Sequence, residues 1–140
     1  MKLIKQCCAI LMLSLVCSGY AYAEKQKLVI QVSTADPEVQ QIALNNAVNV
    51  QTSLGIDNVD VEIVAYGPGL GMLTDKSGQA ERVTSLAMQD IKFSACANTM
   101  AKMEKKSGKK PILLEGVEVV PAGVLRIMEL QQQGYAYIRP

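Results

Sequence analysis

The sequence contains no histidine and no tryptophan, and only one phenylalanine. Without an imidazole, the Ser-His-Asp and Cys-His systems that activate many nucleophiles are excluded. A typical zinc site is also unexpected, because such sites draw on several histidine or cysteine ligands. The shortage of large aromatic rings argues against a groove that stacks sugars or bases. We therefore expect neither a metal nor a cofactor, and any nucleophile must be activated by other means.

Residues 1–23 have the order of a secretory signal peptide. Lys2 and Lys5 form a basic start, an apolar run extends from Cys7 to Cys17, and Ala21-Tyr22-Ala23 supplies small residues at a cleavage site. The apolar run is shorter than the roughly 20 residues that a membrane-spanning helix needs. We expect cleavage after Ala23, which leaves one α/β domain of residues 24–140 in the periplasm or outside the cell.

Two alternatives remain open for this segment. One is lipid attachment at Cys17, for which the preceding Val16 is a poor fit because a small residue is required there. The other is an uncleaved N-terminal anchor, although the hydrophobic run matches the length found in signal peptides better.

The charges nearly balance, with 14 Lys and Arg against 13 Asp and Glu, and removing residues 1–23 would leave one more acid than base. Nucleic-acid binding usually requires a clear basic excess, so we do not expect it. No later segment is long and apolar enough for stable membrane insertion after signal cleavage. A basic cluster of Lys102, Lys105, Lys106, Lys109 and Lys110 is interpreted as solvated surface, with a docking patch for an acidic partner as the alternative.

Only one of the four cysteines in the chain would remain after removal of the predicted signal peptide. Cys7, Cys8 and Cys17 lie within it, so Cys96 is left alone and has no intramolecular disulfide partner. An unpaired cysteine in an exported protein indicates a reactive or intermolecular thiol. The alternative is a small buried hydrophobic residue, because cysteine is among the most buried residue types.

Strand and helix patterns alternate from residue 27 onward. Strands are expected at Lys27–Val32, Val59–Tyr66, Ile91–Cys96, Val117–Val120 and Tyr135–Ile138, and helices at Pro37–Leu54, Gln79–Gln89, Ala97–Lys106 and Ala122–Gln133. In the first helix, Val39, Ile42, Ala43, Ala47, Val50 and Leu54 recur at helical spacing. Met72, Met88, Met100, Met103 and Met128 are interpreted as core residues. This alternation predicts a parallel sheet with helices on both faces, and the order of its strands stays open.

Three segments should meet at the carboxyl edge of the sheet, where open α/β sheets bind ligands. They are Gly67-Pro68-Gly69, Cys96-Ala97-Asn98-Thr99 and Pro121-Ala122-Gly123. Cys96 ends a strand and begins a helix, so free N–H groups should face its sulfur and favour the thiolate. Asn98 and Thr99 either donate to a group on the sulfur or merely satisfy the helix start. The glycine-rich segment Gly67–Gly71 is interpreted as a tight turn, because it lacks phosphate-loop spacing. The alternative is an anion cradle formed by its backbone, from which Pro68 removes one donor.

Four stretches, taken in order, resemble the DsrE/DsrF-like family: Val61–Gly69, Phe93–Thr99, Val119–Val124 and Leu130–Ile138. The resemblance implies a three-layer α/β/α sandwich with a mostly parallel five-stranded sheet, assembled as a homotrimer or homohexamer. It also implies a sulfur relay in which a cysteine that corresponds to Cys96 carries the sulfur as a persulfide.

These observations together predict a periplasmic sulfur-handling protein that carries or transfers sulfane sulfur as a persulfide on Cys96. Asn98 and Thr99 would stabilise the thiolate, and the turns Gly67–Gly69 and Pro121–Gly123 would shape the pocket. A sulfur donor or acceptor protein is the expected partner. The alternative is a non-enzymatic oligomeric module that binds a small ligand or a protein, with Cys96 as a structural thiol.

Overall fold

The computed structural model describes residues 24–140. The predicted signal peptide lies outside these residues, so its cleavage and the alternatives at Cys17 stay predictions. The strands are β1 (Gln26–Val32), β2 (Val59–Ala65), β3 (Ile91–Cys96), β4 (Val117–Val120) and β5 (Ala136–Ile138). The helices are α2 (Pro37–Leu54), α3 (Ala80–Ala87), α4 (Ala97–Ser107) and α5 (Gly123–Gln132), with 3-10 helices η1 (Ile56–Asn58) and η2 (Gly67–Leu73).

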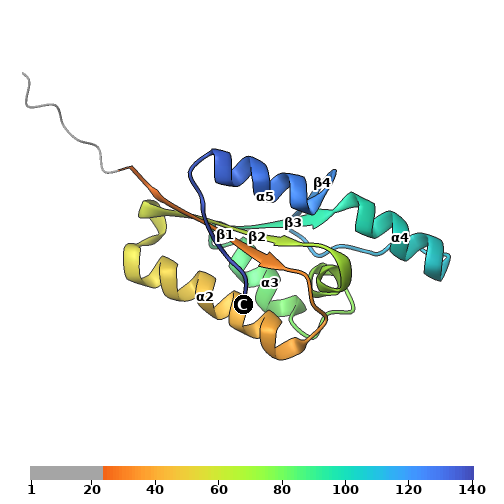
Figure 1. Ribbon diagram of the computed structural model, residues 1–140. Helices are drawn as coiled ribbons and strands as arrows, with labels where there is room; N and C mark the ends of the chain where they lie inside the picture. Colours follow the sequence, from red (N-terminus) through yellow and green to blue (C-terminus); the bar gives the residue numbers. More distant parts are fainter. Residues whose placement is uncertain (1–23) are drawn as a thin grey trace, which may run out of the picture.

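The five strands form one parallel sheet in the order β4-β3-β2-β1-β5. Helices α2 and α3 cover one face, and α5 covers the other (Figure 1). Helix α4 continues from β3 past the end of the sheet. The predicted three-layer α/β/α sandwich with a five-stranded parallel sheet is therefore confirmed.

Local signals explain where the first helix begins and ends. The Asp36 carboxylate accepts a hydrogen bond from the backbone N–H of Glu38 at 2.9 Å, and Pro37 occupies the first helical position. Gly55 ends the helix with a φ of 89°, a conformation that residues with a Cβ rarely adopt. These boundaries match the predicted ones.

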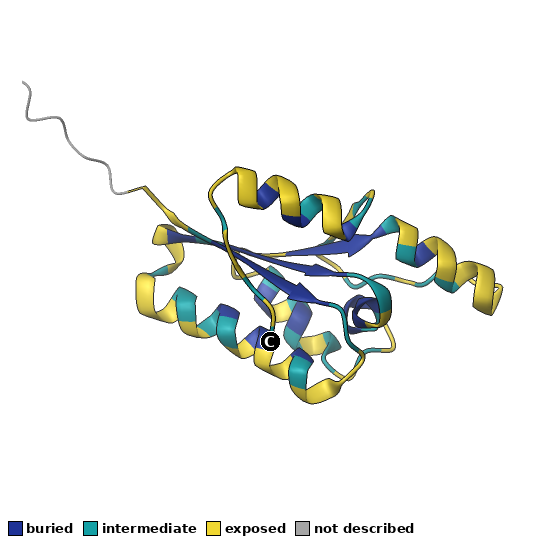
Figure 2. Cartoon of the chain, viewed as in Figure 1, coloured by how far each residue is buried: buried dark blue, intermediate teal, exposed yellow. Residues whose placement is uncertain are grey.

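Most of the hydrophobic core lies between the sheet and the layer of α2, α3 and η2 (Figure 2). Alternate residues of the central strands, such as Ile30, Ile63 and Phe93, are fully buried on this face. The other face holds a smaller apolar cluster of Val29, Val64, Ile127 and Leu130 beneath α5. Burial on both faces explains the continuous apolar runs in the strands.

The buried stripe of α2 differs from the predicted one. Ile42 and Leu54 are exposed, whereas Gln40 and Leu44 are buried with the predicted Ala43 and Ala47. Gln40 can be buried because its side-chain amide donates to the Thr34 carbonyl at 3.0 Å. The helix is therefore rotated from the orientation that its apolar residues alone suggest.

Two further expectations were wrong. The segment after β2 is not a simple tight turn but begins the 3-10 helix η2, because Leu70, Met72 and Leu73 are buried in the core. Met88 and Met128 are 77% and 52% exposed, so they are not core residues.

Candidate functional site

Cys96 is both the last residue of β3 and the N-cap residue of α4, as the sequence predicted. Only 5% of its surface is exposed. The strand fixes the position of the sulfur at the carboxyl edge of the sheet. The start of α4 directs free backbone N–H groups toward it, because the first turn of a helix has no internal acceptors for them.

The surroundings of Cys96 favour the thiolate. Burial by itself raises the pKa of the thiol, because an anion loses hydration in the protein interior. The hydroxyl of Thr99 and the backbone N–H groups of Gly123, Thr99 and Asn98 oppose this effect, and together they bring the pKa below its ordinary value of 9.0. Cys96 makes no side-chain capping hydrogen bond at the start of α4. The neighbouring groups therefore favour the thiolate without a histidine.

Thr99 connects Cys96 to the glycine-rich segment. The backbone N–H of Gly67 donates to Thr99 Oγ1 at 2.9 Å. This contact uses the hydroxyl oxygen as acceptor, so the single hydroxyl proton is left to be donated to the sulfur. Gly67 itself has a φ of 53°, in the left-handed region that favours glycine. The turn after β2 thus orients the residue that acts on the thiol.

The other glycines of the predicted site act by close packing. A Cβ on Gly69 would collide with the backbone of Val32 at the end of β1, so Gly69 holds the turn against the sheet. A Cβ on Gly123 would lie 2.8 Å from Tyr66 Cδ1. The absence of a side chain at Gly123 therefore lets the start of α5 come close to Tyr66 and to the sulfur.

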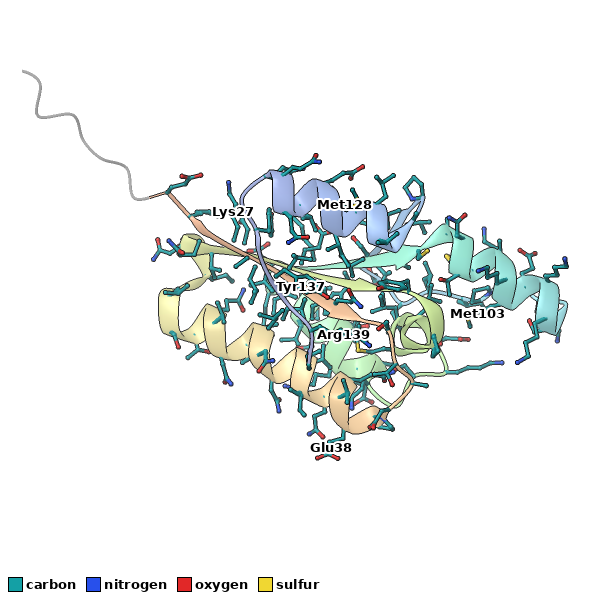
Figure 3. All side chains as sticks on the ribbon, viewed as in Figure 1. Lys27, Glu38, Met103, Met128, Tyr137 and Arg139 are labelled. Atoms are coloured by element: carbon teal, nitrogen blue, oxygen red, sulfur yellow. The ribbon has the colours of Figure 1, made fainter. Side chains whose placement is uncertain are left out.

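A cavity of about 430 Å³ lies beside this arrangement and includes Gly67, Pro68 and Thr99 in its wall. Tyr66, Gly71, Lys102, Met103 and Lys106 complete the wall, and Cys96 is not part of it. Lys102 and Lys106 are one turn apart on α4 and give the cavity a positive charge. Figure 3 labels Met103 on the same helix.

Two predicted site residues lie less centrally. Asn98 is exposed, and only its backbone N–H approaches the sulfur. Pro121 is exposed and precedes α5 without starting it, because Ala122 still has an extended backbone with φ −145° and ψ 128°. The structure therefore brings Cys96 together with Thr99, Gly67 and Gly123, while Asn98 contributes its backbone alone.

A buried polar network near Cys96 was missed at the level of sequence. Arg126 donates to both Glu62 carboxylate oxygens, from Nε to Oε1 and from Nη2 to Oε2, each at 2.7 Å. Ser94 Oγ donates to Glu62 Oε1 at 2.6 Å. The Glu62 hydrogen bond raises the pKa of Arg126, so the guanidinium stays charged. The available signal was an acid within the apolar strand and an arginine within an apolar helix.

Two further properties concern residues 24–140 only. No group of three or more Cys, Asp or Glu side chains in this part of the chain could hold a metal ion. No helix in it combines the length and the apolar character needed to cross a membrane.

The fold and the site define an α/β sandwich protein with a thiol at the carboxyl edge of a parallel sheet. A model of the DsrE/DsrF-like family matches residues 26–140, so the chain belongs to this family, which is often linked to sulfur relay. The structure is similar to that of MTH1491, a protein of unknown function from Methanobacterium thermoautotrophicum. The two share 33% identity and a TM-score of 0.75, over 83% of this chain and all of that one. No curated protein matches the chain.

Proposed function

We propose that this protein carries sulfane sulfur as a persulfide on Cys96 and passes it to an acceptor. The observation that carries the proposal is a buried thiol at the β3–α4 junction, beside groups of Thr99, Asn98 and Gly123 that lower its pKa. Membership of a family linked to sulfur relay supports it. The same donors that favour the thiolate would stabilise a persulfide anion, which is the nucleophilic form of the loaded site.

The proposed transfer needs no external oxidant or reductant. The Cys96 thiolate attacks the outer sulfur of a persulfide or polysulfide donor, and the donor S–S bond breaks. A persulfide donor then leaves as a thiolate, and a polysulfide donor leaves as a polysulfide anion that is one sulfur shorter. A new S–S bond then joins that sulfur to Cys96. In the second step an acceptor thiolate, or a sulfur oxyanion such as sulfite, attacks the outer sulfur and releases the Cys96 thiolate. Each step exchanges one bond to the transferred sulfur for another.

The cavity beside Thr99 supports an anionic sulfur species as the donor. Lys102 and Lys106 are in its wall, and no Asp or Glu is. Positive charge in a confined space raises the local concentration of anions. Polysulfides are anionic at neutral pH and are small compared with a cavity of about 430 Å³.

The chain also offers surface for self-association, which we propose as a homotrimer or homohexamer. Val124, Leu125 and Met128 of α5 are 59%, 46% and 52% exposed, and Val119 of β4 is 53% exposed. Neighbouring exposed apolar residues commonly mark protein contacts. Light scattering of the purified protein tests this proposal, and a monomer at micromolar concentration would contradict it.

The location that we propose is the periplasm or the exterior of the cell. It is supported by the pattern of residues 1–23, and intact-mass measurement of the exported protein tests it. A protein that starts at Glu24 is expected, whereas retained residues 1–23 or a lipid on Cys17 would contradict the prediction.

Incubation with polysulfide followed by mass spectrometry of the Cys96 peptide tests the sulfur-carrier function. The expected result is the addition of one or more sulfur atoms that dithiothreitol removes and that Cys96→Ser abolishes. Equal masses for the treated and untreated wild-type peptide would instead favour the non-enzymatic oligomeric binding module, in which Cys96 is a structural thiol.

A further inference from the structure

The buried carboxylate of Glu62 joins two elements that both lead to Cys96. Glu62 is 1% exposed, and its hydrogen bonds come from Ser94 of β3 and Arg126 of α5. No buried side-chain nitrogen or oxygen within residues 24–140 lacks a partner, so the network is fully satisfied. A satisfied buried ion pair fixes geometry, because moving either partner exposes an unpaired charge to the interior.

Both hydrogen-bond partners of Glu62, Ser94 and Arg126, lie a few residues from groups around the sulfur. Ser94 is two residues before Cys96 on the same strand, and side chains two residues apart on a strand share one face. Arg126 is three residues after Gly123, about one helical turn along α5. The backbone N–H of Arg126 donates to the Ala122 carbonyl at 3.0 Å and so closes that first turn. Fixing Arg126 therefore also fixes Gly123.

The first turn of α5 has little apolar packing beyond that of Gly123 against Tyr66. Val124 and Leu125 are exposed, and the large buried residues of the helix, Ile127 and Leu130, come later. The planar guanidinium of Arg126 meets Glu62 with two parallel hydrogen bonds, which restrict rotation of the helix as well as its distance from the sheet.

We propose that Glu62 and Arg126 are positioning residues for Cys96: their ion pair holds the first turn of α5, and with it the buried backbone of Gly123, beside the end of β3 where Cys96 lies opposite Val120. The ion pair acts through position and not through its charges, because the groups that shift the thiol pKa include no charged side chain. The ionisable groups around the pair are Asp60, Lys92, Glu129 and Tyr135. This inference concerns the thiolate on which the proposed function rests.

The test measures alkylation of Cys96 by iodoacetamide across pH, by mass spectrometry of the Cys96 peptide from the full chain. The variant is Glu62→Gln/Arg126→Met, which leaves no buried charge and keeps an amide oxygen for the Ser94 hydroxyl. Weakening one donor should slow alkylation at neutral pH by roughly two- to tenfold, the range that one ordinary hydrogen bond corresponds to. The midpoint of the profile should move to higher pH, and the plateau rate should stay the same.

Controls separate positioning from general damage. Glu129→Gln removes only the 3.7 Å contact to Arg126 Nη1 and should leave the profile unchanged. Arg126→Lys keeps the charge but loses the two-pronged contact, so its midpoint should lie between those of the wild type and the double variant. A double variant without a cooperative unfolding transition is not properly folded. In that case the midpoint of the Arg126→Lys alkylation profile tests the proposal instead.

The proposal would be overturned if a folded variant alkylated Cys96 with the same pH midpoint as the wild type. It would also be overturned if the variant lowered only the plateau rate of alkylation. The assay contains no sulfur donor. A failure of persulfide formation would therefore leave this inference standing, and a failure here would leave the sulfur-carrier proposal standing.

Discussion

The two faces of the sheet are built in different ways. The face toward α2 and α3 is a large apolar core that contains Phe93, Ile30 and Ile63, each fully buried. The face toward α5 has a small apolar cluster and most of the buried polar side chains, which are Gln31, Glu62 and Ser94. Hydrophobic burial is non-directional, whereas hydrogen bonds and ion pairs require particular geometry.

This difference suggests a division of roles. The α2 and α3 face supplies most of the stability, and the α5 face determines where the groups around Cys96 are placed. Cys96 lies where β3 ends and α4 begins, and groups of α4 and of the start of α5 lower the pKa of its thiol. Substitutions on the first face should therefore affect unfolding alone, whereas substitutions on the second should also affect thiol chemistry.

Phe93→Ala should have the largest effect on stability. It removes a fully buried aromatic ring from the large core and should cost about 3–5 kcal/mol in the free energy of unfolding. Urea denaturation checks this loss, while the alkylation profile of the remaining folded protein should keep its midpoint. Met88→Ala, at a residue 77% exposed, is the matched control and should change stability by less than about 0.5 kcal/mol.

Arg126→Met alone should cost less than Phe93→Ala but more than the double variant with Glu62→Gln. It leaves the buried Glu62 carboxylate without its cation, and we expect about 2–3 kcal/mol, below the usual range for a buried pair because Arg126 is 27% exposed. Urea denaturation of the single and double variants measures the difference. A single variant as stable as the double variant would show that the α5 face does not depend on this ion pair.

Thr99→Val should slow the alkylation of Cys96 while lowering the free energy of unfolding only modestly. It removes the hydroxyl that acts on Cys96 and that accepts from the Gly67 N–H, at a cost of about 1–2 kcal/mol. The pKa of the Cys96 thiol should rise, because a donor to the thiolate is lost. Alkylation at neutral pH should therefore slow, and Thr99→Ser should restore the wild-type rate. A Thr99→Ser rate equal to that of Thr99→Val would contradict this role of the hydroxyl.

The smallest effect is a dependence of stability on pH. Because the folded pKa of Cys96 is lower than the ordinary value of 9.0, folding favours the thiolate. The stabilisation is present above 9.0 and is lost as pH falls through the folded pKa. The unfolding free energy of the wild type minus that of Cys96→Ser should therefore increase with pH up to about 9. A constant or falling difference would mean that the thiolate is not stabilised.

The sequence predicted most of the fold because the signals for it are local. The boundaries of β3 and β4 matched, since short stretches rich in apolar residues and the helix starts that follow them are read from neighbouring residues. The rotation of α2 was not predicted, because the burial of Gln40 depends on an acceptor at Thr34. The 3-10 helix η2 was not predicted, because three glycines in the segment indicated a turn. The burial of Leu70 and Leu73 has no comparable signal in the local sequence.

The candidate site was predicted only in part. Cys96 and Thr99 are near each other in sequence, so a helix start is enough to associate them. The effect of Gly123 on the pKa of the Cys96 thiol depends on the placement of α5 across the sheet, which no local pattern reveals. The network of Glu62, Ser94 and Arg126 joins three elements, so it requires the strand order as well as the register.

The pH dependence of Cys96 alkylation in the folded wild-type protein tests the central claim most directly. We expect the folded midpoint to lie below that of the same protein unfolded in urea, because the groups of Thr99, Gly123 and Asn98 outweigh the effect of burial. Unfolding the same protein in urea should move the midpoint up toward the ordinary value. A folded midpoint at or above that of the unfolded protein would contradict the claim that this site favours the thiolate.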